Sequence, residues 1–168
     1  MPLSATVSVG IDFNQSGSAD FGPQRFEGKV STLLQFANGT GANQADILFA
    51  DERTVASNTN DDLDLAGVLS NAFGQTITAA KVVAVLLINK PLLASDPANT
   101  TNLTLGGSSN PVPSLSSGAI GPGGAVLLVD PDAGGLATVT ASTGDILRVA
   151  NSSGAAAKYQ ILILARSA

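Results

Sequence analysis

The stretch Lys81–Asn89 reads Lys-Val-Val-Ala-Val-Leu-Leu-Ile-Asn and contains seven consecutive apolar residues. Its length and its β-branched residues predict a strand rather than a helix. Pro91 follows shortly after, and proline cannot donate to a β ladder. Because no polar residue interrupts the run, we expect a central strand that is covered on both faces. Ala125–Val129 and Tyr159–Ala165 have the same character. We expect them to lie beside this strand, so that the three together form one side of a common core.

Shorter segments of alternating polar and apolar residues surround this centre. Residues 75–78 alternate and predict that the central strand begins at Thr76, so that one strand spans Thr76–Asn89. Thr6–Phe13 predicts a half-buried strand, and Asn14–Pro23, rich in Gly and Ser, a loop or mobile arm. Arg25–Ala37 alternates until Leu33-Leu34, where the slip in the pattern predicts a bulge or a bend. Further strands are expected at 58–65, 102–105, 125–129, 137–141, 146–150 and 158–165, while 45–55 is either a strand or a loosely ordered segment.

One segment departs from the β pattern. In Ala66–Phe73 the apolar residues Val68, Leu69 and Phe73 fall near helical spacing, and Gly74 is a typical helix stop. We therefore expect a short helical turn near residues 66–73.

Short strands separated by turn-forming residues predict an all-β fold, namely a single-domain β-sandwich that is jelly-roll-like. No internal repeat is visible, which disfavours a solenoid or propeller. Residues 1–23 are expected to form an N-terminal arm or first strand that could contact a partner, and residues 24–168 the β-sandwich domain.

The chain is unusually poor in charge. Only 12% of its 168 residues are Asp, Glu, Lys or Arg, against about 25% in typical soluble domains. Two explanations fit: a neutral polar surface, or a surface that is largely buried against other subunits, because interface cores are depleted in charge. The sequence leaves both open.

The distribution and types of residues exclude several kinds of function. Acidic residues gather between Asp46 and Asp64, and no Lys or Arg occurs between Lys90 and Arg148. Because nucleic acids and anionic membranes require basic patches, we expect neither as a partner. The chain has no Cys and no His, so it has no disulfide, no thiol nucleophile and no ordinary Ser-His-Asp triad. No signal peptide is visible, and the apolar runs are shorter than the ~20 residues that span a bilayer.

Two groups of carboxylates could bind Ca²⁺ through oxygen ligands. The first is Asp61, Asp62 and Asp64; the second is Asp130 and Asp132, with Asp145 as a third ligand. Neither matches an EF-hand loop, and aspartate is also common in turns because it bends and caps the backbone. The turn interpretation is favoured, so we expect no metal and no cofactor. Since Trp is absent and one Tyr is present, a sugar-cleaving carboxylate pair is not expected, and the chain is interpreted as no enzyme.

Three groups of segments resemble a known group of proteins. They are Phe36–Asp46; Asp62–Gly67 with Ala72–Gly74; and, towards the C-terminus, Gly121–Gly124, Asp130–Asp132 and Gly144–Asn151. Together they look like small virion proteins encoded near the capsid genes of tailed bacteriophages, the capsid decoration or cement proteins. The resemblance covers about Gln35–Ala165 and consists of turn and strand patterns. It implies a β-sandwich on the capsid exterior that binds the major capsid protein and carries no catalytic residue.

From the residues we expect an interface in the N-terminal segment, formed by Leu3, Val7, Val9 and Phe13. The expected partners are the major capsid protein and further copies of the chain, as a dimer or trimer. The alternative is a tail or fibre component, or a virion protein that binds a host receptor. The acidic region Asp46–Asp64 faces either a basic patch on a partner or solvent, where charge discourages strand-to-strand aggregation; solvent is the favoured interpretation.

Overall fold

The computed structural model describes residues 2–152 and 154–168, and within them it contains strands and no helix. An all-β fold is therefore confirmed. The strands are β1 (Ala5–Ala19), β2 (Gly22–Phe36), β3 (Ile47–Val55), β4 (Thr59–Asp64), β5 (Ala66–Ser70), β6 (Thr76–Thr78), β7 (Lys81–Ile88), β8 (Leu103–Leu105), β9 (Ala125–Val129), β10 (Ala137–Thr138), β11 (Ile146–Asn151) and β12 (Ala157–Arg166).

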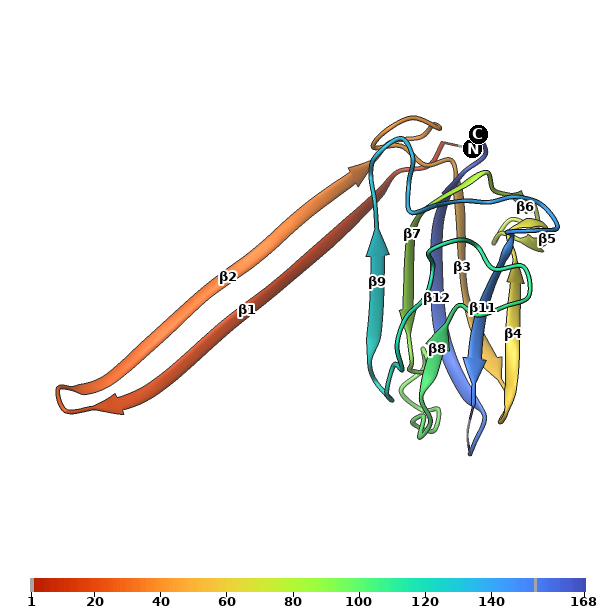
Figure 1. Cartoon of the computed structure of the whole chain (residues 1–168). Helices are drawn as coiled ribbons and strands as arrows, with labels where there is room; N and C mark the ends of the chain where they lie inside the picture. Colours follow the sequence, from red (N-terminus) through yellow and green to blue (C-terminus); the bar gives the residue numbers. More distant parts are fainter. Residues whose placement is uncertain (1, 153) are drawn as a thin grey trace.

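The first two strands form a hairpin that projects from the rest of the molecule, and we call it the arm (Figure 1). Its ladder is antiparallel and unbroken from Ala5 opposite Phe36 to Ala19 opposite Gly22, and only Asp20 and Phe21 lie between the strands. Gly22 has a φ of 104°, a conformation that glycine adopts without strain. Of the two predictions for Asn14–Pro23, a loop or a mobile arm, the loop is wrong, because those residues pair as the distal end of the hairpin that forms the arm.

The remaining residues, from 37 onward, form what we call the body. One sheet has five strands in the order β10-β7-β12-β3, with β9 also paired to β7, and a second has three in the order β4-β11-β8. A small ribbon pairs β5 with β6. All these strand pairs are antiparallel, so each hydrophobic strand can turn one face towards a shared core.

The main core lies where the two larger sheets contribute side chains to one cluster. It unites Val85 and Leu87 of β7, Ile161 of β12 and Leu147 and Val149 of β11, each exposing 2% or less of its surface. Alternation places these side chains on one face of each strand. The apolar run at Lys81–Asn89 thus forms a central strand, β7, between β12 on one side and β9 and β10 on the other.

A second, smaller cluster lies on the opposite face of the five-stranded sheet. Val83, Ala84 and Leu164 of the sheet are buried there with Phe36, and Val7 and Leu34 of the arm pack against them partly buried. The base of the arm therefore covers one end of this outer face. β7 is covered on both faces at this end, as its unbroken apolar sequence predicts.

Arg166 ties the end of β12 to the loops beside the arm. It is fully buried, and its guanidinium donates to the carbonyls of Gln44 at 2.9 Å, Asp132 at 2.7 Å, Ala133 at 2.9 Å and Pro131 at 3.1 Å. A planar fork of N–H donors can satisfy several carbonyls at once. One side chain thus fixes the loop before β3 and the loop after β9.

Three sequence predictions of local structure are corrected here. Ala66–Ser70 is strand β5, not part of a helical turn; it pairs with β6, and this tertiary pairing overrides a weak helical spacing. The expected single strand Thr76–Asn89 is divided into β6 and β7, which belong to different sheets. No bulge occurs at Leu33-Leu34, because the arm ladder keeps its register there.

The expected boundary between arm and domain falls at residue 23, at the beginning of β2. In the structure the arm continues to Phe36, since the second strand of the hairpin is needed to pair the first. The arm is therefore a hairpin rather than a single N-terminal strand.

Candidate interaction surface

The arm has one apolar and one polar face, because opposite residues of an antiparallel pair share a face. The apolar face carries Val7, Val9, Ile11 and Phe13 from β1, and Phe26, Val30 and Leu34 from β2. Beyond the base, none of the residues that the structure describes covers this face: Ile11 exposes 70% of its surface, Phe26 66% and Val30 72%. We call the exposed set Val9, Ile11, Phe13, Phe26 and Val30 the arm face.

Two aromatic residues organise the middle of the arm face. The ring of Phe13 lies over Gly28, its partner on β2; a Cβ at that glycine would come within 2.6 Å of the ring. The rings of Phe13 and Phe26 are 5.4 Å apart between centroids and tilted by 35°. Such tilted pairs attract one another. The glycine thus leaves room for a flat aromatic patch, and Phe13 remains only 38% exposed.

The polar face of the arm bears short hydrophilic side chains and ion pairs. Arg25 contacts Glu27 at 2.6 Å, and Lys29 contacts Asp12 at 3.6 Å. Leu33 is a large apolar residue on this face and exposes 58% of its surface. These exposed ion pairs contribute little stability, but they identify this face as the one that is compatible with solvent.

The structure separates the four predicted interface residues into two pairs. Leu3 and Val7 pack partly buried against the body around Phe36 and Leu164, so their main contact lies within the chain. Val9 and Phe13 lie on the exposed arm face, 41% and 38% exposed. Ile11, Phe26 and Val30 extend that face and were missed as site residues. The alternation of Thr6–Phe13 and of the residues from Arg25 onward was the signal, once the two segments are paired as a hairpin.

The outer face of the five-stranded sheet is the second apolar surface. Ladder partners form three rows across it: Val129-Ala84-Leu164-Leu48, then Leu127-Leu86-Leu162-Ala50, then Ala125-Ile88-Gln160-Glu52. The first row lies at the end covered by the base of the arm. The second row is wholly apolar, although the outer face of an antiparallel sheet is normally polar. Its three leucines are only partly buried, and Ala50 is exposed.

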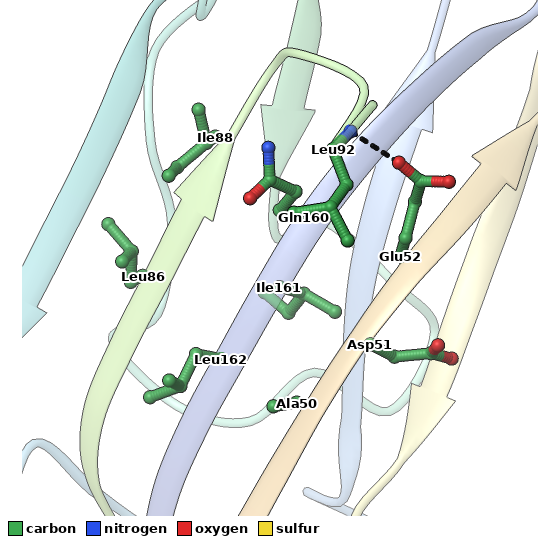
Figure 2. Close-up of a pocket in the computed structure, with 9 residues that line it drawn as sticks. All are labelled: Ala50, Asp51, Glu52, Leu86, Ile88, Leu92, Gln160, Ile161 and Leu162. Carbon is green, nitrogen blue, oxygen red and sulfur yellow. Dashed lines mark hydrogen bonds between the residues drawn. The ribbon is translucent and has the colours of Figure 1, made fainter. Parts of the chain in front are cut away.

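A shallow groove of about 420 Å³ lies over the second and third rows (Figure 2). Leu86, Ile88 and Leu162 line it from β7 and β12, Ala50 from β3, and Leu92 from the loop after β7. Gln160 and Glu52 supply its polar side; the Glu52 carboxylate accepts the backbone N–H of Leu92. The groove is thus an apolar strip with a polar margin.

The carboxylates considered for Ca²⁺ are engaged with protein groups instead. Asp61 receives two hydrogen bonds from the Arg53 guanidinium, at 2.7 and 2.8 Å, and a third from the Tyr159 hydroxyl at 2.7 Å. Burial acts to raise the pKa of Asp61, but these hydrogen bonds outweigh it and leave the pKa below its ordinary value. Burial and the bond to Asp61 raise the pKa of Tyr159. The cluster joins β4 to β3 and β12, and so links the two larger sheets.

The other aspartates have similarly local partners. Arg148 forms a two-pronged pair with Asp62 at 2.6 and 2.7 Å, which lowers the pKa of that carboxyl. Asp64 accepts the N–H of Ala66, and Asp130 the N–H of Asp132. Asp145 accepts the N–H of Ser142 at 2.5 Å. Over residues 2–152 and 154–168 no three metal-binding side chains gather into a group.

Comparison with known protein families, with curated proteins and with solved structures gives no match. Among the residues that the structure describes, no helix has the length and apolar character needed to cross a membrane.

Proposed function

We propose that this chain is a structural virion protein that decorates or cements a bacteriophage capsid by binding the lattice of the major capsid protein. It acts on the capsid exterior as a homo-oligomer of two or three copies, without an enzymatic role, a cofactor, nucleic acid or a membrane. Its body is proposed to be a jelly-roll-like β-sandwich, and the core that β7 and β12 share with β11 supports this arrangement.

The observation that carries the proposal is the exposed apolar face of the arm. Ile11, Phe26 and Val30 each expose about two thirds of their surface or more, on a hairpin whose distal half has no second layer. A two-stranded hairpin is marginally stable in water by itself. Packing against another macromolecule would bury the apolar face of the arm and stabilise the hairpin. A subunit of a large assembly has such neighbours.

The composition supports the same role. A chain with 12% charged residues and two separate apolar surfaces suits a protein that buries its surface against neighbours. Contacts repeated over many copies hold a shell even when each contact is weak. The sequence resemblance over Gln35–Ala165 supplies the choice of a capsid as that assembly.

The alternative is a tail or fibre component, or a virion protein that binds a host receptor. An exposed arm suits attachment to a tail as well as to a capsid. Phe21 favours this alternative to some degree, because it is fully exposed at the tip of the arm, where a receptor-binding aromatic would lie. Binding to host cells without binding to capsids would decide for it.

Purified protein mixed with capsid shells that lack it tests the proposal. We expect saturable binding at a fixed number of copies per capsid subunit, measured by co-sedimentation. A variant with residues 10–31 replaced by an Asn-Gly turn should bind far less while its body remains folded, since Val9 and Thr32 are ladder partners and a two-residue turn can join them. Full-length protein that ignores such shells would refute the capsid role.

A further inference from the structure

Two exposed apolar surfaces of the same chain have matching shapes and chemistry. The arm face is a ribbon two strands wide whose surface is formed by aliphatic and aromatic side chains. The groove on the outer face of the five-stranded sheet is an apolar strip lined by Leu86, Ile88 and Leu162. Two β layers with apolar inner faces pack about 10 Å apart. Each surface therefore has the form that the other requires.

The chain already makes this type of contact at the base of the arm. Val7 and Leu34 belong to the same hairpin face as Ile11 and Val30, and they pack against Ala84 and Leu164 of the outer face. Further from the base, the hairpin face and the sheet face both continue without cover. A contact between these two uncovered faces would therefore continue the packing that the chain already makes at the base of the arm.

The arm points away from its own groove. It leaves the body at its base, and its tip lies far from the sheets (Figure 1). The ladder holds its two strands together from Ala5 to Ala19, and the base is packed on the outer face through Val7 and Leu34. Moving the arm onto its own groove would require this packed base to shift, whereas a second molecule can meet the arm in its present position.

The expected contact is small but is made twice by each copy. From Val9 opposite Thr32 to Gln15 opposite Phe26, the arm face is about 23 Å long and 10 Å wide at ~3.3 Å per residue and ~4.8 Å between strands. Each copy that gives one arm and receives another thus buries about 450 Å² of its own surface. Standard interfaces bury about 800 Å² per partner, so a single exchange is a weak contact that repetition in an assembly strengthens.

We propose that copies of this chain exchange arms: the arm face of one copy packs on the groove of a neighbouring copy, over Leu86, Ile88 and Leu162. The arm extends the apolar layer that the neighbour's own arm base begins. This inference deepens the proposed function and rests on it, since both assign the arm to assembly. It names the arm's immediate partner as a second copy rather than the capsid protein.

Cross-linking between two singly substituted proteins tests the contact directly, because the chain has no cysteine of its own. Ile11→Cys in a size-tagged chain is mixed with Leu86→Cys in an untagged chain and treated with a short bismaleimide, in the absence of any capsid. We expect a cross-linked species containing one chain of each size. Leu33→Cys, on the polar face of the arm, and Asn60→Cys, in β4 of the other large sheet, are the matched controls and should yield at least about tenfold less.

The outcomes separate the possible occupants of the groove. A yield for Ile11→Cys with Leu86→Cys no higher than for the controls overturns the proposal. So does an Ile11→Cys/Leu86→Cys double variant that cross-links within one chain while the mixture of single variants does not, because the arm then closes on its own body. Because the cross-linking is done without capsids, its result is independent of capsid binding. Arm exchange can fail while the protein still binds capsids, and it can occur in a protein that does not bind them.

Self-association of the unmodified chain provides the second measurement. Ile11→Thr with Val30→Thr keeps β-branched residues on the arm but removes apolar surface, and should raise the dissociation constant by about 100-fold in sedimentation equilibrium. Leu33→Thr, the matched change on the opposite face, should leave it within about twofold. Equal effects from both variants, or a full-length chain that stays monomeric at high concentration, would overturn the exchange of arms.

Discussion

The arm and the body are built from the same kind of strand but differ in what covers them. Ile161 in β12 and Ile11 in β1 are both isoleucines in antiparallel strands, yet they are 2% and 70% exposed. β12 lies between two neighbours and under a second sheet's side chains, whereas β1 has one neighbour and no covering layer beyond its base. Alternation specifies an apolar face; only the surroundings determine whether that face is buried.

This difference predicts where the folding free energy resides. Substitutions in the body and in the base of the arm should change the stability of the isolated chain, while substitutions in the arm beyond its base should change only its association. Burial of apolar surface contributes about 25 cal/mol per Å², and the arm realises that contribution only after it binds. The predictions below test the division, beginning with the largest expected effect.

Arg166→Met should destabilise the body most, by about 4 kcal/mol, because it leaves the carbonyls of four residues without their buried donor. Methionine fills a similar volume, so loss of hydrogen bonds rather than a cavity dominates. Chemical denaturation of the chain at low concentration measures the change. Arg166→Lys keeps the charge but not the planar fork, and should recover less than half of the loss.

Leu87→Ala should cost about 3 kcal/mol, the typical result of emptying a fully buried leucine site. The matched change in the arm, Leu33→Ala, should have an effect near zero, because that side chain is largely exposed. Both variants are compared by denaturation under conditions in which the protein is monomeric. Similar costs at the two positions would show that the arm is part of the cooperative unit.

Most strands of the body could be predicted from sequence, because apolar runs mark the strands and turn-forming residues mark where they end. The apolar run at Lys81–Asn89 predicted the central strand β7, and the run at 125–129 predicted β9. The segment 66–73, predicted as a helical turn, could not be distinguished from a strand, because the five residues of β5 are too few to separate a period of 3.6 from one of 2. Its pairing with β6 is a tertiary effect that local sequence does not encode.

The candidate interaction surface was predictable only in part. Val9 and Phe13 were identified, but Val30 was not, since its place on the same face depends on the register with which β2 pairs β1. The groove was hidden for a different reason. The uninterrupted apolar sequence of β7 predicts cover on both faces, and it does not reveal that the cover stops after the first row of the sheet.

The link between the two sheets at Asp61 should make stability depend on pH. The pKa of Asp61 is lower in the folded protein than its ordinary value, so the contribution is present above the unfolded pKa of about 3.9 and is lost as the pH falls through the folded pKa. Asp61→Asn should therefore destabilise the body by about 1–2 kcal/mol at pH 7. The difference from the parent protein should shrink below pH 4.

Asp62→Asn is the control for this pH dependence. Asp62 also pairs with an arginine, but its side chain is 42% exposed, and solvent weakens such pairs. Its substitution should change the stability at pH 7 less than that of Asp61. If the loss of unfolding free energy depends on pH in the same way for both variants, the contacts of Asp61 with Arg53 and Tyr159 add no more stability than an exposed ion pair.

The smallest effect on stability, and the most informative one, is expected in the arm itself. Val30→Thr should change the free energy of unfolding of the monomer by less than about 0.5 kcal/mol, as for other exposed positions. Amide hydrogen exchange should show the distal arm opening far more readily than β7 or β12 in dilute solution, because an isolated hairpin has few contacts to hold it closed. Raising the protein concentration should slow exchange on both arm strands, since a hairpin that packs on a neighbour can open only after that neighbour leaves. An arm as strongly protected as β7 in the monomer would mean that the hairpin is stable alone, and that its apolar face does not depend on a partner.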